Sequence, residues 1–247
     1  MKHFRHQFSC LHTVPGTIFL VHPLKKAGQR IMTPMSTEYF ILRIPAILIA
    51  LTIHECAHGF IALRLGDTTA RDAGRLTLNP IAHLDLFGTI MLLFGPFGWA
   101  KPVPVNAYNL ANPKRDMLLV SLAGPLSNII TALVFGYSVR LLMKFEPDFL
   151  TNPYFVGFFT FCIGINIGIA FFNLIPVPPL DGSKILAGLL PNHLIPVFFE
   201  KMRYLPTVFM VLLIAEWGLH IKIFSAIIYP FYKPFAAFWY FLIFWKF

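Results

Sequence analysis

The sequence predicts an all-α polytopic membrane protein with about five or six membrane segments, and three observations lead to this prediction. The chain is 57% hydrophobic and 13% charged, so it is more apolar than an average soluble domain. Residues 117–139 and 154–180 carry no charged side chain, and about 20 such residues span a bilayer as a helix. The basic residues behind the net charge of +9 lie dispersed in short loops, which indicates orientation in a membrane and no nucleic-acid partner.

Five stretches are candidate membrane segments, and no polar linker separates them after residue 35. They are residues 38–64, 86–99, 116–143, 154–180 and 204–245. Charged residues and prolines interrupt the last stretch, so either two helices or one bent hairpin would fit it. This uninterrupted succession predicts a single transmembrane domain over residues 36–247.

Residues 1–35 differ in kind from the rest of the chain. They are basic, and prolines and a glycine break their apolar stretch, so they are unsuited to a spanning helix. They also lack the compact apolar stretch and the small-residue cleavage site of a signal peptide. We expect a disordered or surface-lying tail, with Met32 or Met35 as the hypothetical natural start.

Residues 86–99 are the unusual membrane segment. They are too few, and too rich in Gly, to cross about 30 Å of hydrocarbon as a regular helix. Pro and Val then alternate over residues 102–105, a pattern that suits an extended edge strand. We therefore expect a re-entrant hairpin with a short β-like edge over residues 86–106. Irregular backbone at membrane depth is tolerated where it lines a protein cavity, so the hairpin is expected to line one.

The distribution of basic residues predicts the orientation. If the hairpin enters and leaves by one face, loops 64–85, 100–115 and 181–203 share a side and hold most of the loop Lys and Arg residues. The opposite loop holds only Arg140 and Lys144. The positive-inside bias then places the first face in the cytoplasm. The basic tail is the observation that opposes this orientation.

A cluster of ionisable residues lies inside the first apolar segment. His54 and His58 are four residues apart, so on a helix their rings project from one face and can bind a single cation. With Glu55 between them they form the H-E-x-x-H pattern, in which two His bind Zn²⁺ and Glu acts as general base. The alternative is a set of core residues satisfied by hydrogen bonds, but ionisable groups inside a membrane mark functional sites. Cys56 is expected to point away from the metal face and to pack.

A catalytic zinc site needs a third protein ligand. Asp181 is favoured because it ends an apolar span in a proline-rich run, where Gly182 would permit a sharp turn. The number of intervening spans also returns Asp181 to the face that holds the two histidines. The alternative is that Asp181 caps a helix at about residues 183–190. The candidates considered are Asp67, Asp72, His83, Asp85 and Asp181.

Three motifs, taken in order, resemble those of the site-2 protease family of intramembrane zinc metalloproteases. They are H-E-C-A-H at 54–58, A-G-P-L-S-N at 123–128 and N-L-I-P-V-P-P-L-D-G at 173–182. Residues 66–89 and 98–106 are similar to the family's compact bacterial and archaeal branch, which lacks PDZ and CBS domains.

The resemblance implies a role for each residue that matches a motif. His54, His58 and Asp181 would bind one Zn²⁺ per chain, and Glu55 would be the general base. Asn173 would hold the substrate backbone or the oxyanion, the alternative being an interhelical hydrogen bond.

The middle motif is expected to be structural. Gly124 would allow close helix approach, Asn128 would bond across helices, and Pro125 would shape the packing beside the site.

The predicted hairpin suggests how a substrate binds. An unwound substrate segment could pair with its edge strand by strand addition. Because the flanking prolines lack an N–H, such pairing would use Lys101, Val103 and Val105.

The sequence thus predicts a zinc metalloendopeptidase that hydrolyses peptide bonds within or near transmembrane segments of membrane proteins. A single-span membrane protein is the expected substrate, a regulatory membrane partner is open, and the oligomeric state is not determined. The expected location is a prokaryotic cell membrane, with the active site nearer the cytoplasmic face. Two alternatives stay open, namely a zinc-binding transporter or channel and a catalytically silent membrane chaperone.

Overall fold

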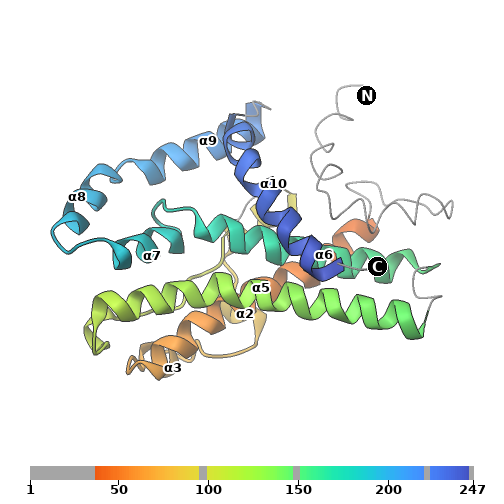
Figure 1. The fold of residues 1–247 in the computed structure, drawn as a ribbon, viewed down its shortest axis with the longest axis horizontal. Coiled ribbons are helices and arrows are strands. Elements are labelled where there is room, and N and C mark those ends of the chain that lie inside the picture. Colours follow the sequence, from red (N-terminus) through yellow and green to blue (C-terminus); the bar gives the residue numbers. More distant parts are fainter. Residues whose placement is uncertain (1–36, 95–98, 147–150, 220–222, 245–247) are drawn as a thin grey trace.

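The protein is mostly helical, in agreement with the predicted class (Figure 1). The computed structural model describes residues 37–94, 99–146, 151–219 and 223–244. The predicted tail at residues 1–35 lies outside these ranges. Within them the chain forms no β-sheet, and four helices are long and apolar enough to cross a membrane.

Three long helices form the centre of the molecule. They are α2 (Thr37–Arg64), α5 (Pro113–Phe145) and α6 (Pro153–Leu174), and each packs extensively against the other two. Helix α10 (Ile223–Phe244) crosses α5 and α6, where Ile243 and Tyr240 join their buried core (Figure 1). Helix contacts in a membrane depend on close packing of small residues, and fully buried Ala46 and Ala50 provide this on α2.

Shorter helices connect and flank this bundle. Helix α7 (Asp181–Leu189) packs on α5, while α8 (Leu194–Lys201) and α9 (Leu205–Leu219) arch away before α10 returns (Figure 1). The region 204–245 therefore forms two helices, of which α9 has 15 residues and is shorter than a regular span. Helix α3 (Thr69–Asp72) is a single turn beyond the end of α2.

Asn-Pro pairs start two of the central helices. Asn112 precedes α5 and Asn152 precedes α6, and each side chain accepts a hydrogen bond from a backbone N–H of the first turn. The following proline lies at the first helical position, where its missing N–H costs nothing. The predicted span 154–180 is corrected at its other end, because α6 stops at Leu174 before the proline-rich run begins.

The predicted hairpin is partly helical. Residues Leu86–Phe94 form helix α4, so the expectation of irregular backbone there was wrong; Asp85 accepts a hydrogen bond from the backbone N–H of Gly88 in its first turn at 2.8 Å. Residues 95–98 lie outside the described ranges. The chain does return to its starting point, because Leu84 and Ala100 form an antiparallel bridge. Beyond that bridge, residues 101–106 form neither helix nor strand.

Candidate metal centre

His54 and His58 on α2 direct their Nε2 atoms toward the same point. Nδ1 of His54 lies 2.6 Å from Oδ1 of Asn128, and Nδ1 of His58 lies 2.7 Å from the carbonyl oxygen of Val120. Both partners accept hydrogen bonds, so each Nδ1 carries the proton and each Nε2 keeps its lone pair. The two Nε2 atoms are 3.1 Å apart. This arrangement prepares both rings as metal ligands, because a ligating His usually donates its other N–H to a fixed acceptor.

Asp181 completes the group from the first turn of α7. Its Oδ2 lies 3.2 Å from Nε2 of His54 and 3.1 Å from Nε2 of His58. Its side chain faces the rings, and no capping hydrogen bond starts α7, so the alternative capping role is not observed.

The spacing of these atoms fits a zinc ion. Two lone-pair nitrogens and a carboxylate oxygen stand together in a buried site, and they repel one another unless a cation or a proton lies between them. A tetrahedral zinc bound at about 2.0–2.1 Å places neighbouring ligands about 3.3 Å apart. The separations of 3.1–3.2 Å are close to that value. The residues therefore suit one zinc ion and leave a fourth position for water or substrate.

The middle motif explains how α5 reaches the site. A Cβ atom on Gly124 would lie 2.5 Å from Nε2 of His58 and 2.6 Å from Cε1 of His54, so this position requires glycine. Asn128, fully buried four residues later, bonds across helices as predicted: besides His54, its Nδ2 donates to the Ala50 carbonyl at 3.0 Å. Its neighbour Pro125 is also buried inside α5.

One polar residue of this network was missed by the sequence reasoning. Nδ2 of Asn128 also donates to Oδ1 of Asn166 at 2.8 Å, and Nδ2 of Asn166 donates to the Cys162 carbonyl at 2.7 Å. These bonds fix which atom of the Asn128 amide faces His54. An Asn in the middle of the apolar α6 was the available signal, since buried polar groups in a membrane need partners.

Glu55 lies on α2 next to His54 and is buried. Its Oε2 accepts a hydrogen bond from the backbone N–H of Val103 at 2.8 Å. A contact between residues this far apart in sequence depends on how the 101–106 segment docks against α2. No local sequence pattern predicts the contact between Glu55 and Val103.

The four other candidate third ligands have different partners. Asp67 and Asp85 accept hydrogen bonds from backbone N–H groups. Asp72 forms an exposed ion pair with Arg71 at 2.9 Å, and His83 donates to a backbone carbonyl. Within the described ranges none of the four joins the His–His–Asp group.

The predicted substrate-binding residues have partners within the chain, and their contact with a substrate stays a prediction. Lys101 and Val103 were expected to offer N–H groups to a substrate strand, but they donate to the His83 carbonyl and to Glu55. Val105 belongs to the same 101–106 segment and is half-buried. The side chain of Asn173 donates to the carbonyl of Ile169 in its own helix at 3.1 Å, and its contact with a substrate stays a prediction.

Glycine is required at position 182 for a different reason from the predicted sharp turn. It lies inside α7, and among the described glycines only Gly66 and Gly74 have positive φ. A Cβ at Gly182 would instead collide with the carbonyl oxygens of Leu174 and Ile175. Glycine is required because α7 starts directly against the end of α6, which brings Asp181 to the histidines.

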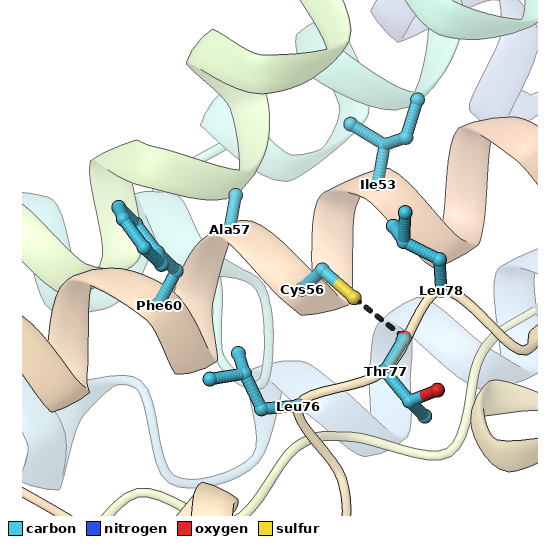
Figure 2. A pocket seen from close by; sticks show the side chains of 7 residues that line it. All are labelled: Ile53, Cys56, Ala57, Phe60, Leu76, Thr77 and Leu78. Atoms are coloured by element: carbon cyan, nitrogen blue, oxygen red, sulfur yellow. Dashed lines mark hydrogen bonds between the residues drawn. The ribbon is translucent and has the colours of Figure 1, made fainter.

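The side of α2 opposite the metal centre carries an apolar groove of about 360 Å³. Figure 2 shows Cys56 and Ala57 lining it together with residues 76–78. The thiol of Cys56 donates to the Thr77 carbonyl at 2.7 Å, the dashed line in Figure 2. Cys56 thus faces away from the metal ligands, as the helix spacing predicts.

Comparisons with known proteins agree with this geometry. A model of peptidase family M50 matches residues 141–214, the stretch that contains Asn173 and Asp181. YwhC of Bacillus subtilis (strain 168) is 38% identical over 200 residues, which cover 74% of this chain and 91% of YwhC. This chain belongs to peptidase family M50. The resemblance to site-2 proteases is thereby confirmed, and the M50 chain is an intramembrane zinc metalloprotease.

Other relatives align with a smaller part of the chain. Rip2 of Mycobacterium tuberculosis (strain ATCC 25618 / H37Rv) is 32% identical over 166 residues, covering 65% of this chain and 61% of Rip2. MJ0611 of Methanocaldococcus jannaschii is 31% identical over 147 residues, covering 60% of this chain and 70% of MJ0611. The names of YwhC, Rip2 and MJ0611 assign them provisionally to the zinc metalloproteases. No solved structure matches the chain significantly.

Proposed function

We propose that this M50 peptidase cleaves single-span membrane proteins and that His54, His58 and Asp181 bind its zinc while Glu55 acts as general base. The observation that carries the proposal is the convergence of the three ligand atoms, all within 4.8 Å of one another. Glu55 follows His54 on the same helix and so lies beside this point. A transport site would not need Glu55 as a general base.

The roles of the residues follow from their contacts. When bound, zinc polarises the scissile carbonyl and lowers the pKa of its water. Glu55 would take a proton from the attacking water and deliver it to the leaving amine. Since Oε2 of Glu55 holds the Val103 N–H, Oε1 is the oxygen that exchanges the proton. Asn128 and the Val120 carbonyl keep the two imidazoles in the tautomer that leaves Nε2 free.

We place the metal centre nearer the cytoplasmic face of a prokaryotic cell membrane. His58 is six residues before the end of α2 at Arg64, which corresponds to about 9 Å at 1.5 Å per residue. The loops at this end of α2 carry most of the basic loop residues, which supports a cytoplasmic location. The relatives from bacteria and an archaeon support a prokaryotic membrane.

The test compares wild type with Glu55→Gln on a reporter single-span membrane protein, with bound zinc measured in both. The proposal predicts that the variant keeps its zinc and loses cleavage. Glu200→Gln is the matched control, because it makes the same chemical change at an exposed position on α8. Cleavage by Glu55→Gln at the wild-type rate would contradict the proposal.

A further inference from the structure

Asp67 is a fully buried carboxylate that the metal centre does not use. It follows the end of α2, where its own N–H donates to the carbonyl of Ala62 at 2.9 Å. Its Oδ1 accepts hydrogen bonds from the backbone N–H and hydroxyl of Thr69 and from Nδ2 of Asn109, the last at 2.8 Å. Its Oδ2 accepts the backbone N–H of Asn106 at 2.7 Å. Both oxygens are therefore used as acceptors.

One of these bonds fixes the end of the segment that contacts the general base. Residues 101–106, here called the strap, are bound at their start by the N–H of Lys101, which donates to the His83 carbonyl at 2.9 Å. Nη2 of Arg75 donates to the carbonyl of Lys101 at 2.8 Å. Asp67 binds the other end at Asn106. The strap is thus tied at both ends, with its middle lying over α2.

The middle of the strap presents a single N–H group. Pro102 and Pro104 flank Val103, have no N–H to donate and fix their own φ, so they stiffen the strap. The Val103 N–H donates to Oε2 of Glu55 at 2.8 Å. The Val103 side chain is buried over Gly59, where an added Cβ would lie 3.2 Å from Val103 Cγ1.

We propose that Asp67 is a positioning residue for the general base: by holding Asn106, it keeps the Val103 N–H on Glu55 and so orients the carboxylate for proton transfer. The inference rests on the proposed role of Glu55. Among the described residues the hydrogen-bond partners of Asp67 include none of the three metal ligands, so its connection to Glu55 runs through the strap. Its loss is therefore expected to change the chemical step while zinc and substrate binding stay intact.

A carboxylate suits this position for a physical reason. All the groups facing Asp67 are donors, and an ionised carboxylate offers acceptors only. The amide of Asp67→Asn would turn N–H donors toward either Asn106 or Thr69, which breaks the strap's attachment. Asp72 provides a matched control, because it lies five residues away and is exposed. Among the described residues its carboxylate accepts hydrogen bonds from Thr68 and Arg71 and from no residue of the strap.

The first experiment measures zinc content, kcat and KM for Asp67→Asn and Asp72→Asn on the reporter substrate. For Asp67→Asn we expect unchanged zinc content, a KM within about twofold of wild type and a kcat lowered about tenfold. A tenfold loss in rate corresponds to about the free energy of one hydrogen bond to a charged group. Asp72→Asn is expected to match wild type. A wild-type kcat in Asp67→Asn would overturn the proposal.

The second experiment separates positioning from a general structural role. Replacing Val103 by its α-hydroxy acid puts an ester oxygen in place of the N–H that reaches Glu55 and keeps the side chain, and kcat should again fall about tenfold or more. Combined with Asp67→Asn, the loss should be no greater than in the worse single variant, because both changes break one connection. Multiplied losses of about a hundredfold would show that Asp67 acts by another route.

An analogue of Asn106 and the Glu55→Gln variant serve as further comparisons. If Asp67→Asn fails to bind zinc, the α-hydroxy acid analogue of Asn106 is used, which puts an ester oxygen in place of the N–H that Asp67 accepts. The same loss in kcat is expected, and a wild-type kcat would again overturn the proposal. Glu55→Gln is assayed beside these variants. Full activity in Glu55→Gln would defeat the proposed function, whereas an inactive Glu55→Gln with fully active strap variants would defeat this inference alone.

Discussion

Substituting Gly124 by Ala tests how tightly α5 is held against the metal centre. The added Cβ would lie 2.5 Å from Nε2 of His58 and 2.6 Å from Cε1 of His54. Ordinary van der Waals contact begins at 3.4 Å, so the rings or the helix must move apart by about 0.9 Å. Metal ligands tolerate errors of about 0.2 Å, so the ligand geometry is lost. We expect zinc affinity to fall at least as much as when a ligand's orienting partner is removed, about 10- to 100-fold or more.

The assay is competition for zinc against a chelator of known affinity, in detergent, with folding followed by circular dichroism. Gly168→Ala on α6 is the matched control, since a Cβ at that glycine meets no atom within 4 Å. The control should bind zinc as wild type does. A Gly124→Ala protein with wild-type zinc affinity would refute the packing argument, because the histidines could then not occupy the positions seen here.

Three further predictions concern the surroundings of the site. Asn128→Ala removes the acceptor that fixes the His54 tautomer, so zinc affinity measured by the same competition should fall about 10- to 100-fold; an unchanged affinity would exclude this orienting role. Cys56→Ala should keep wild-type zinc content and kcat in the reporter assay, because the thiol faces the groove on the other side of α2; loss of zinc would make it a ligand. The third concerns pH. Burial raises the pKa of the Asp67 carboxyl, but hydrogen bonds from Thr69, Asn109 and Asn106 outweigh this and lower it. Its stabilisation is therefore complete above the ordinary Asp pKa of about 3.9 and is lost as the pH falls through the lower folded-state value. The Tm difference between wild type and Asp67→Asn should shrink between about pH 7 and about pH 3; a constant difference would contradict the depressed pKa.

The residues found from sequence are those whose geometry is local or follows from chain direction. The i, i+4 spacing places His54 and His58 on one face of α2 whatever the tertiary packing. Asp181 could be placed near them because the number of spans determines the face to which the chain returns. Apolar length alone predicted the spanning helices α2, α5 and α6.

The features that the sequence did not predict depend on packing between distant segments. The Val103 N–H was expected to bind substrate, and only the docked strap shows that it binds Glu55. Gly182 carries no turn signal, since its role is to avoid a collision with the end of α6. Helix α4 forms despite its glycine and short length, because neither excludes a helix that need not span the membrane. Asn166 gains its meaning only when α6 lies beside Asn128.

The most direct measurement on the central claim is zinc K-edge X-ray absorption of the purified protein. The structure predicts a first shell of two imidazole nitrogens and carboxylate or water oxygens, with no sulfur. In Asp181→Ala the zinc content should drop sharply, because one of three protein ligands is gone. A sulfur ligand in wild type, or an unchanged spectrum and zinc content in Asp181→Ala, would contradict the metal centre described here.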